Sequence, residues 1–370
     1  LLRMQIEVQK AMRQGAFGVA AALAYPPTSY QTTDELVLLA RSAAKFGGFY
    51  ATHLRSEGDA VLQALDEAIE VGRRAGLPVE VWHLKVAEKQ NWGRMPEVVQ
   101  RIAAARAEGL DVSANVYPYL AGANMLHADV PGWAQAGGVP VMLGRLRDRA
   151  QRERIEKEIA ARWKDPTDPE RVVLMLALSP EARRYEGKSL ADVAKERATT
   201  PAAALVDLVL LDGGSTQVLR FLASEFDLRV ALRQPWVGIG VDASADAPDG
   251  PLGPEGTHPR AFGSMARLLG TYAREEKLFT VEEAVRKVTS GAARRLGVTD
   301  RGILRPGMMA DIVVFDPAKV KDVATYARPK QFPEGIETVL VNGTPVLVDG
   351  YRTEARPGRP LLHPVPDAAR

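Results

Sequence analysis

The chain has 370 residues, of which 46% are hydrophobic and 25% are charged, as expected for a globular protein with a sizeable core. Its 48 basic residues against 46 acidic ones give a net charge of +2, which does not favour a nucleic-acid or anionic-membrane surface. The chain contains no cysteine, so disulfides and thiolate ligands or nucleophiles within it are excluded.

The first residues already look structured. No apolar run approaches the roughly 20 residues needed to span a bilayer, no signal peptide is visible, and a cytoplasmic location is expected. The chain starts at Leu1 rather than Met, and residues 1–14 have the pattern of an amphipathic helix. The sequence therefore predicts that the chain opens inside a folded domain.

Strand and helix patterns alternate over the first third of the chain. The expected strands cover residues 15–25, 49–54, 78–84, 110–117 and, much later, 236–241. The expected helices start after Thr32 or Thr33 and cover about 59–75 and 95–107. This repeat implies parallel strands with helical crossovers, as in a doubly wound sheet or a (β/α)8 barrel.

Polar residues at the strand ends favour the barrel. His53, His83, Tyr117 and Asp242 all lie at the C-terminal end of an expected strand. A barrel gathers such residues at one face, which is where barrel active sites lie. No Gly-rich phosphate loop opens any of the expected helices, which disfavours a dinucleotide-binding sheet.

Two segments interrupt the alternation. Residues from about 120 to 230 hold a strand at 172–178 and helices at 190–197 and 201–211, and are expected to form an elaborated, lid-like connection. Helices are expected at 261–275 and 281–296, and short strands at 302–307, 310–316 and 339–348. The last run contains Asn342-Gly343, a strong hairpin signal. The predicted division is a partial barrel over 1–300, with the 120–230 insertion, and a small β-sandwich portion with a tail over 301–370.

Two of the five histidines occupy equivalent places in the sequence. His53 and His83 lie 30 residues apart, about one strand-and-helix unit, in Thr-His-Leu-Arg and Trp-His-Leu-Lys. Their imidazoles would project from adjacent strands toward one point, as two zinc ligands do. The spacing fits equally well two core histidines that each bind a backbone carbonyl.

Other polar residues have both a functional and a structural interpretation. Asp242 ends an apolar strand, where a carboxylate needs a metal-bound water or a cation, although it could also be a helix N-cap or turn residue. Lys85 could bind a substrate carboxylate or lie at the surface. His258 and Arg260 could bring an imidazole and a guanidinium to the rim, or belong to a loop stiffened by proline. Glu57 has the position of an acid at a helix start.

Short motifs follow one another in a characteristic order across nearly all 370 residues. They are Gly15-Ala-Phe-Gly with Tyr25-Pro-Pro, Ala51-Thr-His-Leu-Arg-Ser-Glu-Gly58, His83-Leu-Lys85 with Asn91-Trp-Gly93, Tyr117-Pro-Tyr119, Val241-Asp242, His258-Pro-Arg260 with Arg267-Leu-Leu-Gly270, Thr289-Ser290 with Ala293, Arg301-Gly302, Ala310-Asp-Ile-Val and Val341-Asn-Gly343. With these motifs the chain resembles the N-acyl-D-amino-acid deacylases, or D-aminoacylases, of the amidohydrolase superfamily.

The resemblance implies an α/β fold, a (β/α)8 TIM barrel beside a small β-sandwich, with the strands of this chain as the fourth to eighth of the barrel. The family's Thr-His-Leu-Arg and His-Leu-Lys motifs supply ligands of the tighter zinc, which by this match are His53 and His83. A second metal site is left open. The aspartate that ends the last strand is the general base and acid, which corresponds to Asp242.

The resemblance also gives substrate contacts. The lysine of His-Leu-Lys and the first tyrosine of Tyr-Pro-Tyr bind the substrate carboxylate in the family, which corresponds to Lys85 and Tyr117. His258 and Arg260 are further candidate substrate contacts at the rim.

The chain departs from the family pattern in three respects. It has neither the His-X-His motif of the first barrel strand nor the bridging ligand, often cysteine, of a later one. The first three strands, half of the small sandwich and the remaining metal ligands are therefore expected N-terminal to the chain. Asn115 replaces an aspartate two residues before the Tyr-Pro-Tyr motif, and Ala123 replaces a serine six residues beyond its first tyrosine. These two changes bear on the substrate pocket more than on the chemistry.

The sequence thus predicts a zinc-dependent hydrolase that cleaves the amide bond of small N-acyl-D-amino acids, releasing a carboxylate and a D-amino acid. A homo-oligomer is an open expectation. The first alternative is a related cyclic-amide or dipeptide hydrolase, like a dihydroorotase, a hydantoinase or a dipeptidase. The second is a non-catalytic fragment, or a binding or structural homologue with an incomplete metal site, because five of eight strands leave two open edges.

Overall fold

A sheet of five parallel strands lies at the centre of the computed structural model, which describes residues 1–252 and 256–364. The strands are β1 (Gly18–Ala22), β2 (Phe49–His53), β3 (Val79–Val81), β4 (Val112–Val116) and β8 (Val237–Ile239). Their order in the sheet is β1-β2-β3-β4-β8, and each pair is parallel. The five strands expected from the sequence are confirmed, and their order is that of consecutive barrel strands.

Helices connect these strands and pack against the sheet. They are α1 (Leu2–Arg13), α2 (Thr33–Ala44), α3 (Val61–Ala75), α4 (Met95–Ala107), α11 (Glu225–Leu232), α12 (Arg260–Arg267) with its π-helical continuation η6 (Leu268–Glu275), α13 (Val281–Val288) and α14 (Ser290–Arg295). A capping box starts α2, because the Thr32 hydroxyl accepts the Glu35 N–H and the Glu35 carboxylate accepts the Thr32 N–H. Gly76 ends α3 in the left-handed region, at φ 69°.

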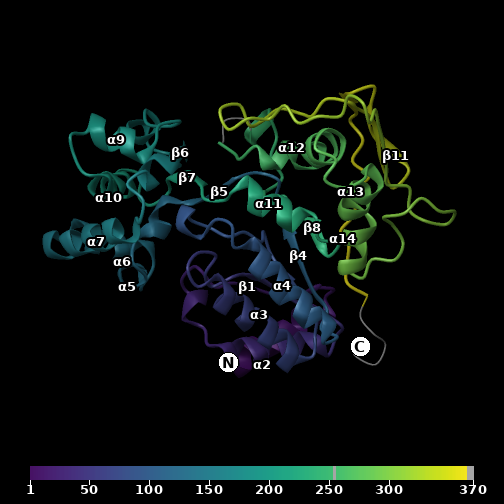
Figure 1. The fold of residues 1–370 in the computed structure, drawn as a ribbon, viewed down its shortest axis with the longest axis horizontal. Coiled ribbons are helices and arrows are strands. Elements are labelled where there is room, and N and C mark those ends of the chain that lie inside the picture. The colour runs from purple at the N-terminus through teal and green to yellow at the C-terminus, as the bar shows by residue number, and fades with distance from the viewer. Residues whose placement is uncertain (253–255, 365–370) are drawn as a thin grey trace.

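The expected insertion has a sheet and a core of its own. Its strands β5 (Ala121–Met125), β6 (Val172–Leu176) and β7 (Gln217–Phe221) pair antiparallel in the order β5-β7-β6. Its helices are α5 (Gly132–Gln135), α6 (Val139–Arg147), α7 (Arg149–Arg162), α8 (Pro180–Arg183), α9 (Leu190–Glu196) and α10 (Pro201–Leu211). These elements gather at one end of the molecule, at the left of Figure 1. The sequence predicted β6 but neither β5 nor β7; β5 is rich in small residues of low strand propensity.

A second antiparallel sheet follows the helices after β8. It contains β9 (Ile312–Phe315), β10 (Ile336–Val341), β11 (Thr344–Val348) and β12 (Tyr351–Arg352), in the order β12-β11-β10-β9. The expected hairpin is confirmed, with Asn342 and Gly343 at φ 50° and 81° between β10 and β11. The expected strand at 302–307 is wrong, because that segment forms turns. The sheet lies at the right of Figure 1. The domain boundary at residue 300 stays a prediction.

The burial pattern of β4 shows how the central sheet presents polar groups. Val112, Ala114 and Val116 are buried, whereas the alternate residues Ser113 and Asn115 are only half-buried and face the polar side of the sheet. The apolar side belongs to the main core, which spans all five parallel strands and the helices packed on them. Within the described part of the chain, no helix is both long and apolar enough to cross a membrane.

Candidate active site

The polar residues predicted from the strand ends meet at one edge of the central sheet. His53 is the last residue of β2, His83 lies two residues beyond β3, and Tyr117 directly follows β4. Asp242 lies three residues beyond β8. Both His83 (φ 38°) and Asp242 (φ 47°) have a backbone conformation that side chains with a Cβ rarely adopt. Such strained residues cluster at functional sites.

A cavity of about 400 Å³ opens at this edge. Six of the seven residues predicted to form the site line it, namely His53, His83, Lys85, Tyr117, Asp242 and Arg260. The opposite wall comes from the insertion, mainly from β5, and includes Asn124, His127 and Arg220. The parallel sheet therefore supplies the candidate chemistry, and the insertion closes the space in which a substrate would bind.

The two imidazoles predicted as metal ligands are in direct contact. His53 Nδ1 lies 2.8 Å from His83 Nε2. A Glu57 carboxylate oxygen lies 3.0 Å from His83 Nδ1, and another lies 3.9 Å from His53 Nε2. Among residues 1–252 and 256–364, these three side chains form a group of possible metal donors within 4.8 Å of one another.

This donor set fits a zinc ion. Zinc binds imidazole nitrogen at about 2.0–2.1 Å in tetrahedral geometry, so two coordinated nitrogens lie about 3.3 Å apart. The contact between His53 and His83 would have to widen by only about 0.5 Å to accept the ion. If His83 binds through Nε2, its Nδ1 is held by the Glu57–Lys85 pair, at 3.0 Å from the Glu57 carboxylate and 2.7 Å from Lys85 Nζ, and such outer contacts orient metal-bound histidines.

The charges around the histidine pair are balanced. Burial lowers the pKa of His53 to about 4, in spite of the Glu57 charge, so at neutral pH the ring is in the neutral form that binds metals. Burial acts to raise the pKa of Glu57, but the Lys85 charge and a hydrogen bond with His83 hold it well below its usual range. Burial acts to lower the pKa of Lys85, but the Glu57 charge raises it overall. Glu57 and Lys85, 2.6 Å apart, are thus a buried ion pair.

The second charged pair joins Asp242 to Arg260. Their side chains approach to 2.8 Å, with the Asp242 side chain 44% exposed and that of Arg260 only 6%. The ion pair does not have hydrogen-bond geometry, because Arg260 Nε and Nη1 are buried without a hydrogen-bond partner. The guanidinium also lies over the Tyr117 ring, 4.5 Å from its centre. Arg260 is therefore a buried cation beside the cavity, and its Nε has no hydrogen-bond partner.

His258 occupies a different position from the other six predicted residues. It is buried, and its Nε2–H donates to the Ala121 carbonyl while its Nδ1 accepts the Arg260 N–H. Both ring nitrogens are thus used by the backbone, and the residue does not line the cavity. The imidazole links the start of α12 to β5 and so supports Arg260.

The sequence missed Glu57 and Arg220. Glu57 has the position of a helix-start acid, but α3 begins only at Val61 and has no acid in its first turn, so that interpretation is wrong. Its spacing of four residues from His53 gave no signal, because residues 54–60 are not helical. Arg220 comes from β7, and its guanidinium binds Asn124 (2.7 Å) in the cavity wall. No sequence pattern marked this residue, because its strand was not predicted.

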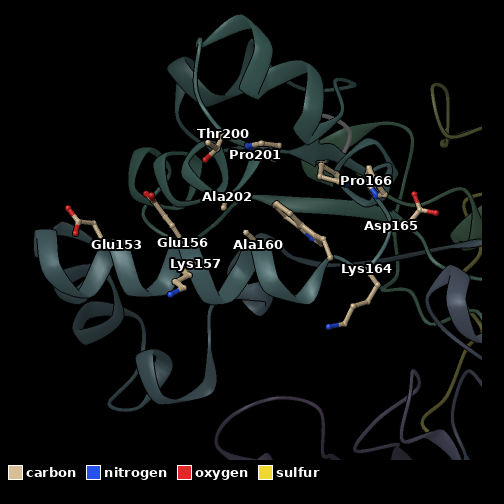
Figure 2. A pocket seen from close by; sticks show the side chains of 12 residues that line it. Glu153, Glu156, Lys157, Ala160, Lys164, Asp165, Pro166, Thr200, Pro201 and Ala202 are labelled. Atoms are coloured by element: carbon tan, nitrogen blue, oxygen red, sulfur yellow. The ribbon is translucent and has the colours of Figure 1, made fainter.

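A larger groove lies on the insertion, between α7, the loop after it and the start of α10 (Figure 2). Its volume is about 590 Å³, and acidic and lysine side chains such as Glu153, Lys157 and Asp165 lie around it. None of its twelve described lining residues is a histidine. The smaller cavity at the strand ends is therefore the candidate active site, because chemistry depends on side chains rather than on volume.

Comparisons with known proteins agree with this fold. The model of the amidohydrolase family matches residues 7–347. A D-aminoacylase from Alcaligenes xylosoxydans xylosoxydans is 34% identical over 361 residues, which are 95% of this chain and 63% of that protein. An N-acyl-D-glutamate deacylase from the same organism is 33% identical over 97% of this chain and 63% of its own length. The chain thus spans less than two thirds of these relatives.

A solved structure shows the same similarity in three dimensions. The N-acyl-D-glutamate deacylase of Bordetella bronchiseptica, complexed with zinc and a phosphonate inhibitor that mimics the tetrahedral intermediate, superposes with a TM-score of 0.77. It is 30% identical in sequence, and the match covers 97% of this chain and 65% of that one. The family match over most of the chain and this structural similarity lead to one conclusion: the chain belongs to the amidohydrolase family.

Proposed function

We propose that this chain takes part in the zinc-dependent hydrolysis of N-acyl-D-amino acids, with the cavity at the strand ends as the active site. The observation that carries the proposal is the joint placement of two contacting imidazoles, the Asp242 carboxylate and the buried cations Lys85 and Arg260 around one cavity. The names of two relatives reported above, a D-aminoacylase and an N-acyl-D-glutamate deacylase, describe activity on such substrates.

The substrate carboxylate would bind between Lys85, Tyr117 and Arg260. A buried donor without a partner costs free energy, and the Nε of Arg260 would gain a partner from a carboxylate. Burial raises the pKa of Tyr117, so its hydroxyl stays protonated and can donate as well. Lys85 lies 5.5 Å from the centre of the Tyr117 ring and adds a second positive charge. This arrangement would fix the amide with its carbonyl toward the histidine pair.

The zinc would be held by His53 and His83. When bound, zinc polarises a carbonyl and lowers the pKa of a coordinated water toward about 7. Asp242 would accept a proton from the attacking water and then donate it to the leaving amine nitrogen as the carbon–nitrogen bond breaks. The products would be the carboxylate of the acyl group and a D-amino acid. The exposed position of Asp242 at the cavity mouth suits a group that exchanges protons with water.

The substitution Asp242→Asn in the purified protein tests the assignment. It should reduce kcat for N-acetyl-D-amino acids by about 10²–10⁴-fold, the range of general acid–base catalysis, and leave the zinc content per chain unchanged. The matched control is Asp249→Asn, which changes an exposed aspartate bound to Arg352 outside the cavity. Turnover of Asp242→Asn within twofold of the wild type would overturn the catalytic role.

Substrate range separates the proposal from its alternatives. N-acetyl-D-amino acids should be cleaved faster than hydantoins, dihydroorotate or dipeptides, because only the first group offers a free carboxylate next to an open-chain secondary amide without a charged amine. Absence of both metal and turnover in the purified protein would favour the binding or structural interpretation. The cytoplasmic location, the homo-oligomer and the domain boundary at residue 300 stay predictions, to be tested by fractionation, light scattering and limited proteolysis.

A further inference from the structure

A polar network lies directly beneath the histidine pair, and Asn115 is at its centre. Asn115 lies on β4, between β3 and β8. Its Oδ1 accepts the backbone N–H of His83 at 2.9 Å. Its Nδ2 donates to Glu80 Oε1, also at 2.9 Å. The side-chain amide thus uses its acceptor for His83 and its donor for Glu80, which fixes its orientation.

The backbone of His83 depends on this contact. Its φ of 38° is unfavourable for a residue with a Cβ and requires support from its surroundings. The neighbouring N–H groups of Trp82 and Leu84 donate to the carbonyls of Thr52 and Asn115, at 2.9 and 2.8 Å. The His83 N–H is instead bound by the Asn115 side chain, so this amide holds the turn that aims the imidazole.

Glu80 is itself held from the far side. The Ser113 hydroxyl donates to its carboxylate, and Arg295 Nε approaches Glu80 Oε2 to 3.2 Å. Glu80 is 8% exposed, and the Arg295 side chain is 16% exposed. A second contact, 2.9 Å from Arg295 Nη2 to Asp111, ties the guanidinium to the other end of β4. The acceptor that orients Asn115 is therefore anchored by two further side chains, Ser113 and Arg295.

The space for the amide is provided by Gly240, the residue that follows β8. A Cβ added to Gly240 would lie 2.5 Å from Asn115 Oδ1 and 2.8 Å from its Cγ. Real Cβ atoms do not approach other atoms this closely, so any other residue at 240 would displace the Asn115 side chain. The His83 N–H, the Glu80 carboxylate and the space left by Gly240 thus all constrain the Asn115 side chain.

We propose that the Asn115–Glu80 pair positions the metal ligand His83. The Asn115 amide holds the backbone conformation of His83, and Glu80 holds the orientation of that amide. The proposal rests on the proposed function, because it takes His83 as a zinc ligand. Asn115 and Glu80 act through His83, and neither lines the cavity. An aspartate at 115 could not donate to Glu80, and two carboxylates would then face each other at hydrogen-bond distance.

The test exchanges the two functional groups. Asn115→Asp alone removes the donor and creates the carboxylate pair. In the double variant Asn115→Asp with Glu80→Gln, the new amide at position 80 would donate to the new carboxylate at position 115, and one carboxylate and one amide remain. The carboxylate at position 115 could still accept the His83 N–H. The double variant therefore keeps the net charge and the number of hydrogen bonds. It reverses the direction of one hydrogen bond and moves the carboxylate from position 80, beside Arg295, to position 115.

Three measurements report on the metal ligand His83 and not only on turnover. They are the Kd for Co²⁺, the visible absorption spectrum of the cobalt protein, and hydrogen exchange of the His83 amide in metal-free protein. Asn115→Asp should raise the Kd by about 10–100-fold, the usual effect of losing a group that orients a metal ligand, alter the spectrum and speed exchange. The double variant should return within about threefold of the wild-type Kd, because its network is complete again. Gly240→Ala should reproduce the Asn115→Asp effects if that variant does not fold.

The outcomes separate this inference from the proposed function. A wild-type Kd and spectrum in Asn115→Asp, or a double variant no better than the single one, would overturn the positioning role. His83→Ala is measured in parallel as the reference. If it keeps the wild-type Kd, the metal assignment itself fails. If it loses the metal while Asn115→Asp does not, only the positioning role fails.

Discussion

The buried ion pair between Glu57 and Lys85 gives a stability prediction that is independent of turnover. Glu57→Gln would leave the Lys85 ammonium, 8% exposed, without the carboxylate 2.6 Å away. Removing one partner of a buried ion pair costs about 3–5 kcal/mol, because the remaining charge is desolvated and unpaired. The amide oxygen introduced at position 57 could still accept from Lys85, which places the expected loss near the lower value, about 3 kcal/mol.

The measurement is thermal unfolding in the presence of a chelator, so that metal binding does not contribute. A loss of about 3 kcal/mol corresponds to about 4 °C in Tm for a chain of 370 residues, because the unfolding entropy is about 2.1 cal/mol/K per residue. Glu57→Gln combined with Lys85→Met removes both charges and should recover most of the loss. Glu153→Gln, which breaks a surface pair with Arg149 (side chains 67% and 93% exposed), should leave Tm unchanged.

The pH dependence gives a further check on the same pair. Because the folded-state pKa of Glu57 is held below its unfolded value, its stabilising effect is present above about pH 4.3. The effect is lost as the pH falls below that value toward the folded pKa. The Tm difference between wild type and Glu57→Gln should therefore shrink on acidification. A difference below about 2 °C at pH 7, or a double variant no more stable than the single one, would refute this account.

Three other predictions concern the cavity, the core and a close backbone approach. Tyr117→Phe should raise KM for an N-acyl-D-amino acid by about 10–100-fold with unchanged zinc content, since one hydrogen bond to a charged group is lost; an unchanged KM would exclude the hydroxyl from binding. Burial lowers the pKa of Lys287 to about 8, below the unfolded value of about 10.4, so stability should rise between these pH values and Lys287→Met should abolish the rise in Tm. Gly263→Ala should destabilise the protein by about 1–3 kcal/mol in denaturant unfolding, because its Cβ would lie 2.1 Å from Asp322 and 2.2 Å from Tyr119; wild-type stability would contradict the tight packing.

Much of the parallel sheet could be predicted because its signals are local. The strands around His53 and His83 are apolar runs followed by amphipathic helices, and both patterns lie within about 30 residues of sequence. The hairpin at Asn342-Gly343 is equally local, since both residues must adopt positive φ. By contrast, β5 and β7 are 92 residues apart (217 − 125) and stabilise each other by pairing, so neither had a pattern of its own.

The candidate site was likewise predicted only in part. Sequence alone selected residue types at strand ends, and parallel strands bring their C-terminal ends to one edge whatever the loops do. Strand-end position therefore suggested His53, His83 and Asp242 as neighbours, and the family resemblance supplied their roles. The direction of each side chain depends on tertiary contacts. Only the structure could show that Glu57 turns toward His83 and that both ring nitrogens of His258 bind the backbone.

Asn115 shows the difference most clearly. The sequence marks it only as a departure from the family's usual aspartate. Its contacts depend on Glu80, 35 residues earlier, and on Gly240, which follows a strand much later in the chain. A hydrogen bond is short and directional, so its partner is set by three-dimensional packing and leaves no periodic trace in the sequence. The sequence determined which strands and polar residues the chain would offer, and the tertiary structure decided which of those residues act on one another.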